Sequence, residues 1–265
     1  GVVLQRRVTL PKSGKDVVIV SINRPDQLNC FNTEVTYALA DVFASLRDET
    51  ELSAVIFTGE GRSFCAGADL ANPPSPLEQS SDLPECLKKN PVHQMLQLQV
   101  PLIGALKGHV VTGGFELALA CDILVGDSTV VFRDTHCKFG FAPCWGLSQR
   151  LQRRIGPGRA KLVSLGAIPV RAEQASKWGL LDDLVVENSV DRALEIADYI
   201  GKNQNTMVVR YKRAIEEGGK MDLERGLQRE RGIGLAHYVD IIGDGETINN
   251  AREFITDGSR PRSKL

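Results

Sequence analysis

The sequence predicts an α/β fold built around a largely parallel sheet. Three observations support this prediction. Short β-branched runs recur along the first 195 of the 265 residues, helical patterns separate several of them, and Gly, Pro, Asn or Asp residues end most of the runs. With 42% hydrophobic residues, the chain can bury a sizeable core, so we expect one large domain with an appendage.

The first strand-helix unit covers residues 16–46. Residues 16–22, DVVIVSI, form a β-branched run that ends at the turn residues Asn23, Arg24 and Pro25. The segment after the turn has apolar residues at the spacing of one helix face, namely Val35, Leu39, Val42, Phe43 and Leu46.

Three further apolar runs predict buried strands at residues 53–59 (SAVIFTG), 101–108 (PLIGALKG) and 122–127 (DILVGD). Helical patterns lie between several of these runs, so we expect parallel pairing. Residues 71–91 contain five of the twelve prolines and predict an irregular surface loop, either a plain connection or a flap beside a site.

Consecutive helical patterns with no intervening strand begin near residue 195. They are SVDRALEIADYIGKN, TMVVRYKRAIEEGG, DLERGLQRERGIGLAHYVD and GETINNAREFI. We therefore divide the chain into a core at residues 1–195 and a helical region at residues 196–265. The apolar faces of these helices predict packing against another subunit or back onto the core.

Composition excludes several function classes. A net charge of −1 gives no electrostatic basis for nucleic-acid binding, and no segment approaches the roughly 20 apolar residues that cross a membrane. The six cysteines form no Cys-x-x-Cys pair and have no His at zinc-finger spacing, so we expect free thiols and no metal site.

A targeting signal is predicted at the C-terminal end of the sequence. Residues 1–3 are not the basic and apolar start of a secretory signal. Ser263, Lys264 and Leu265 form the tripeptide that the peroxisomal import receptor reads, and it follows a polar tail. We therefore expect a peroxisomal protein, or a glycosomal one, because both organelles use this signal.

The sequence contains no dinucleotide fingerprint, Walker A sequence, His-Glu-x-x-His or Gly-x-Ser-x-Gly elbow. What remains are two segments of small residues that each follow a strand: RSFCAGADL at 62–70 and Thr112-Gly113-Gly114. Small residues let a ligand approach the backbone closely. Free N–H groups at a helix start can stabilise a developing oxyanion.

The apolar run HVVTGGFELALACD covers residues 109–122 and ends at Asp122. Glu116 is the one carboxylate inside this run. The helix start favours its charged form and burial opposes that form, so its pKa depends on competing effects. Such a group suits acid-base chemistry. A buried Glu that pairs with an Arg or caps the helix is the structural alternative.

The chain resembles the enoyl-CoA hydratase/isomerase, or crotonase, family. The segments SINRPDQLNCFN, SFCAGADL, GHVVTGGFELALACDI and FGFAPCWGLSQRLQRRIG occur in the order and spacing of that family, and the resemblance covers nearly the whole chain. It implies a ClpP/crotonase-like spiral of β-β-α units over residues 1–195. It also implies that the C-terminal helical region builds trimers, often paired into hexamers.

The resemblance also implies binding of an acyl-coenzyme A thioester whose carbonyl oxygen accepts two backbone N–H bonds. We match Ala66 to the first donor and Gly113 to the second. Residues expected to contact the substrate are Ala66, Gly67, Ala68, Asp69, Leu70, Leu28 and Trp145. For Trp145, aromatic core packing is the alternative. Glu116 matches the first of the two catalytic glutamates of the family hydratases.

The second catalytic glutamate is absent from this sequence, and His136 occupies its position. Histidine can move protons near neutral pH, so His136 is a candidate acid-base group, with a structural His bonded to a backbone carbonyl as the alternative. Asp134 is a nearby carboxylate that we expect to face outward or to be structural. Cys144 occupies a position that is acidic in the dienoyl-CoA isomerases, which argues against that reaction.

We therefore expect an enoyl-CoA hydratase of acyl β-oxidation that uses Glu116 and His136 and needs no cofactor. A Δ3-Δ2-enoyl-CoA isomerase with Glu116 as its single base is the first alternative. An acyl-CoA thioesterase and a non-catalytic RNA-binding homologue are the others. The low net charge argues against RNA binding.

Overall fold

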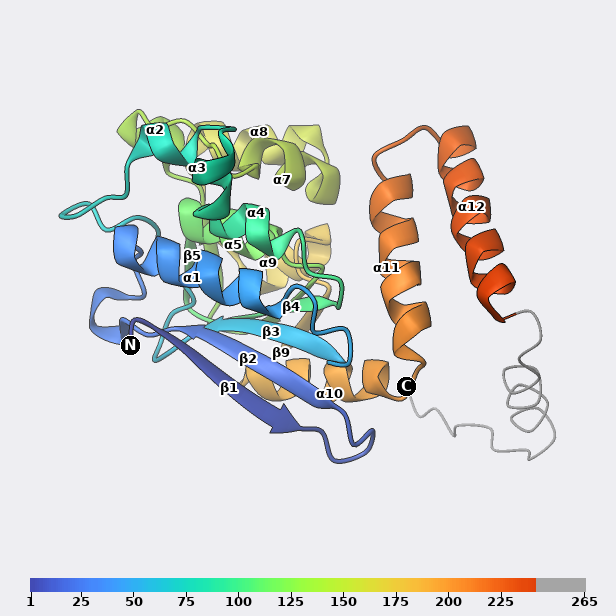
Figure 1. Cartoon of the computed structure of the whole chain (residues 1–265). Coiled ribbons are helices and arrows are strands. Elements are labelled where there is room, and N and C mark those ends of the chain that lie inside the picture. Colours follow the sequence, from blue (N-terminus) through green and yellow to red (C-terminus); the bar gives the residue numbers. More distant parts are fainter. Residues whose placement is uncertain (242–265) are drawn as a thin grey trace. The chain divides into compact units, whose positions relative to one another are not determined.

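The computed structural model describes residues 1–241, and its first compact unit, Gly1–Val209, contains a six-stranded sheet (Figure 1). The strand order is β1-β2-β3-β4-β6-β9. The strands are β1 (Val3–Thr9), β2 (Asp16–Ile22), β3 (Ala54–Gly59), β4 (Leu102–Leu106), β6 (Ile123–Asp127) and β9 (Asp183–Val185). The four predicted strands are β2, β3, β4 and β6, and their observed ends lie within two residues of the predicted ones.

The pairing from β2 through β9 is parallel, as the sequence predicts. The edge strand β1 pairs antiparallel with β2 and is absent from the sequence prediction. Most of its residues are exposed, two of them arginines, so it lacks the apolar run that identifies a buried strand.

A second sheet consists of three short strands. The connections that follow two of them, from β5 to α5 (Gly113–Leu119) and from β7 to α6 (His136–Phe139), lead to the cavity described below. Its order is β5-β7-β8, formed by β5 (His109–Val111), β7 (Val131–Arg133) and β8 (Val170–Arg171). Each has only two or three residues, too few for a periodicity to appear in the sequence. The sequence therefore does not predict this sheet.

The main sheet has a hydrophobic layer on each face because side chains alternate along its strands. Val18, Val20 and Ile22 pack with α1 (Thr33–Leu46) on one face. Val17 and Ile19 pack on the other face, which α10 (Ser189–Gly201) covers (Figure 1). Each of these buried residues contributes on the order of 1.5–3 kcal/mol to folding.

Shorter helices complete the first unit. They are η1 (Pro25–Gln27), α2 (Pro76–Gln79), α3 (Pro84–Lys88), α4 (Pro91–Met95), α5 (Gly113–Leu119), α6 (His136–Phe139), α7 (Leu147–Ile155), α8 (Pro157–Gly166) and α9 (Ala172–Trp178). The proline-rich segment 71–91 thus includes two short helices, each beginning at a proline, where the predicted loop was wholly irregular. Proline suits a first helical position because the N–H that it lacks would be unpaired there.

The predicted boundary at residue 195 is wrong, because it falls inside α10, which belongs to the core. Ala193 and Ala197 of α10 are fully buried against the sheet. The first compact unit extends to Val209 and the second begins at Arg210. The helices α11 (Asn205–Gly218) and α12 (Leu223–Ile241) follow the predicted C-terminal helical patterns, whereas the predicted helix at 245–255 lies outside the described residues.

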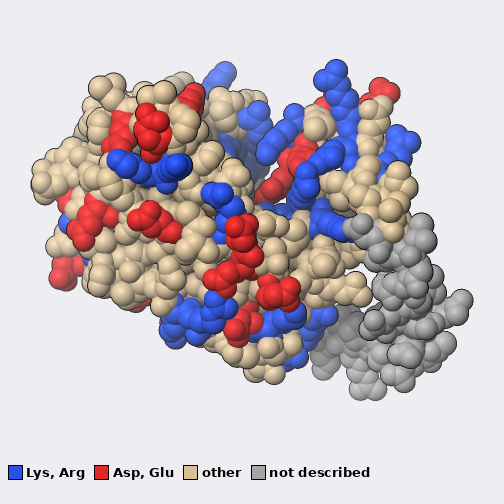
Figure 2. All heavy atoms as spheres, in the orientation of Figure 1, with Lys and Arg blue, Asp and Glu red and all other residues tan. Residues whose placement is uncertain are grey.

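Charges of both signs are interspersed on the surface of the first unit (Figure 2). Ion pairs of Lys15 with Glu51 and of Lys89 with Glu78 are examples. Within residues 1–241, no helix is both long enough and apolar enough to span a bilayer.

Candidate active site

A cavity of about 460 Å³ lies where the loop after β3, the start of α5 and the connection from β7 to α6 meet. The predicted site residues that line it are Ala66, Gly67, Ala68, Leu70, Gly113, Glu116, His136 and Trp145. Segments more than 60 residues apart in the sequence therefore meet around one space. The proline-rich segment supplies a further wall through Pro73, Pro74, Pro76, Gln79 and Ser80.

Two predicted substrate-contacting residues, Leu28 and Asp69, are not part of the cavity wall. The Asp69 carboxylate forms an ion pair with Arg24 at 2.9 Å, and its N–H donates to the Phe31 carbonyl. The Arg24 guanidinium holds the pKa of Asp69 below its usual value. These bonds brace the loop, and contact of Leu28 and Asp69 with the substrate stays a prediction.

The structure contradicts the prediction that Ala66 supplies an oxyanion donor. Its N–H donates to the Leu28 carbonyl at 3.0 Å, so it is not available to a ligand. Leu28 has a φ of 50° at the end of η1, and this left-handed conformation belongs to the turn that presents its carbonyl to Ala66.

The N–H of Ala68, two residues later, has no hydrogen-bond acceptor among residues 1–241. Its direction follows from its own peptide unit. The Gly67 carbonyl of that unit accepts from the Phe31 N–H at 3.0 Å. The structure contains no cis peptide among its described residues, so the Ala68 N–H points the opposite way, away from the Phe31 backbone.

Gly113 is the first residue of α5, and its N–H likewise has no acceptor in the described part of the chain. The segment around Ala68 lies beside the segment that leads into α5, because Cys65 and Val110 form a parallel bridge. A Cβ on Gly67 would lie 3.1 Å from the Val111 carbonyl oxygen. The two unpaired donors therefore come from neighbouring segments that both line the cavity.

The start of α5 has an unusual backbone. Thr112 has φ 51° and ψ −111°, a conformation that favours glycine. Its hydroxyl pairs with the Thr135 hydroxyl at 2.5 Å, and its N–H donates to the Arg133 carbonyl at 2.9 Å. These bonds join the helix start to the connection from β7 to α6. No sequence signal marks this strain, because threonine is common in ordinary loops.

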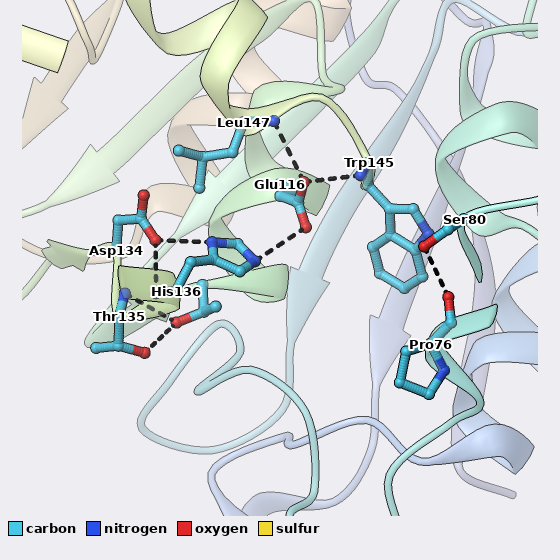
Figure 3. Close-up of polar contacts among 9 residues, drawn as sticks. Pro76, Ser80, Glu116, Asp134, Thr135, His136, Trp145 and Leu147 are labelled. Carbon is cyan, nitrogen blue, oxygen red and sulfur yellow. Dashed lines mark hydrogen bonds and ion pairs between the residues drawn. The ribbon is translucent and has the colours of Figure 1, made fainter. Parts of the chain in front are cut away.

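Glu116 lies on α5 with only 2% of its surface exposed. Its Oε1 accepts the backbone N–H groups of Trp145 at 2.8 Å and Leu147 at 3.2 Å (Figure 3). Burial raises the pKa of the carboxyl above its usual value, although the nearby His136 and the two N–H donors act in the opposite direction. The sequence alternative of pairing with an Arg is contradicted, because the partners are backbone N–H groups and a histidine.

The Oε2 atom of Glu116 faces Nε2 of His136 across 3.8 Å. His136 is the first residue of α6 and is 6% exposed, so a titratable ring lies next to the carboxylate, as the sequence predicts. Its Nδ1 contacts Oδ1 of Asp134 at 2.8 Å (Figure 3). The partner of the ring is therefore a carboxylate, and the backbone-carbonyl alternative is wrong.

Asp134 is buried with 2% exposure and bonded to His136, so of the two expectations the outward-facing one is wrong and the structural one agrees with these contacts. Burial raises the pKa of its carboxyl, but hydrogen bonds from His136 and Ser164 outweigh burial and hold the pKa below its usual value. Its spacing of two residues from His136 was the available signal, since an Asp often accepts the N–H two residues on. The structure shows that bond at 3.0 Å.

Trp145 is buried with 4% exposure, and its ring packs on Phe31 with 5.2 Å between the centroids. The side chain therefore serves both predicted roles, core packing and lining of the cavity. Its backbone N–H, which holds Glu116, is a contact that sequence reasoning missed, because the two residues are separated by 29 positions.

Comparisons with known proteins identify the family that the chain resembles. Residues 12–238 match the family described as enoyl-CoA hydratase/isomerase. The chain is 40% identical over 266 residues to the probable peroxisomal enoyl-CoA hydratase 1 of Arabidopsis thaliana, covering 99% of this chain and 98% of that protein. It is 34% identical to the short-chain-enoyl-CoA hydratase of Clostridium acetobutylicum, covering 84% and 86%. The crystal structure of an enoyl-CoA hydratase from Bacillus anthracis superposes with a TM-score of 0.81 at 28% identity, covering 96% of each chain.

Proposed function

The chain belongs to the enoyl-CoA hydratase/isomerase family, and from this premise we propose that it is an enoyl-CoA hydratase. It binds a 2-enoyl-CoA thioester in the cavity and adds water across the C2=C3 bond. The observation that supports hydration most is the pair formed by Glu116 and His136, whose Oε2 and Nε2 atoms are 3.8 Å apart beside the cavity. Hydration moves two protons, one from water and one to C2, and the pair provides one group for each.

The thioester oxygen is held by the N–H groups of Ala68 and Gly113. Both residues line the cavity, and neither N–H has an acceptor among the described residues. Attack at C3 moves negative charge onto the thioester oxygen. Two donors fixed beforehand stabilise that charge, and the loss of one such donor typically costs about 3 kcal/mol of activation free energy. Ala68 replaces Ala66 in this assignment.

Glu116 acts as the base and the imidazolium of His136 as the acid. The Oε2 atom of Glu116 takes a proton from water while the water oxygen bonds to C3. The resulting enolate carries its charge on the thioester oxygen and accepts a proton at C2 from Nε2 of His136. Transfer of the proton from Glu116 back to His136 restores the starting state, so water and the thioester are the only reactants and no cofactor is needed. This assignment uses the general acid-base roles open to a buried Glu and a His.

His136→Gln tests the two-group mechanism against the single-base isomerase. The change keeps a polar side chain but removes the proton donor, so hydration of crotonyl-CoA is expected to fall about 10²-fold or more. The assay follows loss of the enoyl absorbance and, in D2O, one deuterium at C2 of the 3-hydroxyacyl product. His93→Gln on α4 is the matched control, because His93 is not part of the cavity wall.

Three other results would contradict the proposal. Migration of the double bond in a 3-enoyl-CoA without hydration, unaffected by His136→Gln, identifies a one-base isomerase. Release of free coenzyme A identifies a thioesterase. Retention of RNA with no thioester turnover identifies a binding protein.

We also propose that the protein is a homotrimer or a hexamer assembled through its C-terminal helices. Tyr211 and Ile215 on α11 and Leu227 and Leu235 on α12 are exposed apolar side chains in the single chain. Covering such residues is a common reason for subunit association. Light scattering on the purified protein measures the assembly directly, and a monomer would contradict the proposal.

We propose a peroxisomal location, with import through the receptor that reads Ser263, Lys264 and Leu265. These residues lie outside the described part of the chain. The relative from Arabidopsis thaliana is named peroxisomal, which supports the proposal, whereas a relative from Dictyostelium discoideum is named mitochondrial. Microscopy of a fluorescent fusion with and without the last three residues distinguishes the two locations.

A further inference from the structure

Asp134 makes two contacts with His136 through a single oxygen. Its Oδ1 accepts the backbone N–H of His136 at 3.0 Å and lies 2.8 Å from the ring atom Nδ1 (Figure 3). The first contact stabilises the start of α6. The second contact, with Nδ1, involves only the imidazole ring. Both residues are at least nine-tenths buried, so water has little access to either group.

The Asp134 carboxylate requires a donor at Nδ1. A buried carboxylate is an acceptor only, so the 2.8 Å contact places the proton on Nδ1. Nε2 is then the atom that gains or loses a proton, and Nε2 is the atom that faces Glu116 across 3.8 Å. A carboxylate next to a protonated imidazole also stabilises its positive charge.

The groups around the ring come from three elements. Glu116 belongs to α5, Asp134 to the connection after β7, and Ser164, which bonds the Asp134 carboxylate, to α8. Among the described residues, Glu116 and Asp134 are the two carboxylates that contact His136. Their distances put them at opposite nitrogens of one ring, so the three side chains form a chain that runs from Asp134 through His136 to Glu116.

We propose that Asp134 is a positioning residue that fixes the tautomer of His136 and directs its Nε2 toward Glu116 and the cavity. The effect of Asp134 on turnover rests on the proposed hydratase function. Its effect on the tautomer does not depend on any substrate. In a hydratase that has His136 in place of the second glutamate, the Asp134-His136 pair thereby supplies the proton donor.

Asp134→Asn separates positioning from a purely structural role. At the Oδ1 position the amide oxygen can still accept both the backbone N–H and the ring N–H of His136, so the helix start keeps its cap, but the negative charge beside the ring is lost. Crotonyl-CoA hydration is expected to fall about 10²-fold to 10⁴-fold in kcat, with less than about a threefold change in KM. Asp198→Asn is the matched control, because Asp198 is equally buried and accepts the backbone N–H groups of Lys12 and Ser13 far from the cavity.

The second readout is ¹⁵N NMR of the four histidines in the full chain, with His136→Gln used to assign the His136 signals. When its imidazole is neutral, His136 of the wild type is expected to carry its proton on Nδ1, and Asp134→Ala, which leaves no acceptor from residue 134 at Nδ1, to shift the population toward the Nε2-protonated form. An unchanged tautomer in Asp134→Ala overturns the inference, whatever happens to turnover. If the wild type hydrates no enoyl-CoA but the tautomer shifts as expected, the hydratase proposal fails and the positioning role stands.

Discussion

Glu116→Gln is expected to lower turnover of a 2-enoyl-CoA by about 10²-fold or more and, at neutral pH, to raise the melting temperature. The loss of activity follows because an amide cannot take a proton from water. The gain in stability follows because burial raises the pKa of Glu116, so the folded state holds its charge unfavourably. The amide oxygen of Gln can still accept the N–H groups of Trp145 and Leu147 that now hold Oε1.

The pH dependence of that stability gain has a defined sign. A carboxyl whose pKa is higher in the folded state binds its proton more tightly when folded. Wild-type stability therefore falls as the pH rises from the usual Glu value of 4.5 through the raised value, and the Gln variant lacks this loss. The difference in melting temperature should thus be larger at pH 7 than at pH 4.

Glu60→Gln is the control, because Glu60 is half-buried near the end of β3 and is not part of the cavity wall. Turnover and melting temperature of this variant should stay close to wild type. Full activity in Glu116→Gln would remove the residue from the mechanism, and a lower melting temperature at neutral pH would contradict the assigned effect of burial.

The fold was predictable where one strand or helix carries its own signal. The strands β2 and β3 are continuous apolar runs, and α1 shows its buried face at regular spacing. The edge strand β1 and the three strands of the second sheet gave no such signal, because they are exposed or very short. The boundary near residue 195 was misplaced because α10 resembles the later helices in sequence, and only packing shows that it covers the sheet.

The site was predictable in its residue types and less so in its contacts. Glu116 and His136 could be placed from the sequence, but the atoms that they contact depend on long-range packing. The choice between Ala66 and Ala68 depends on which of the two N–H groups the Leu28 carbonyl accepts, and no composition or spacing encodes that choice. The burial of Asp134 could not be read from the sequence for the same reason, since it depends on long-range packing.

Gly113→Ala is expected to cause a large loss of both activity and stability. A Cβ on Gly113 would lie 2.4 Å from Cζ and 2.8 Å from Cε1 of Phe31, so either the ring or the start of α5 must move. Movement of α5 displaces the N–H proposed to hold the thioester oxygen, and loss of such a donor lowers kcat about 10²-fold to 10³-fold. Overpacking of this kind also costs about 1–3 kcal/mol of unfolding free energy. Steady-state kinetics and urea unfolding measure the two effects.

The cause can be isolated with Phe31→Leu, which removes the Cζ and Cε atoms that the new Cβ would meet. If this clash causes the loss, Gly113→Ala in the Phe31→Leu background should lower the free energy of unfolding by at least about 1 kcal/mol less than it does in wild type. The double variant should also recover part of kcat. Both results are expected because substitutions at contacting residues are non-additive. Gly158→Ala on α8 is the control, since its Cβ would meet nothing within 4 Å. Strict additivity of Gly113→Ala and Phe31→Leu would show that the clash with Phe31 does not cause the loss.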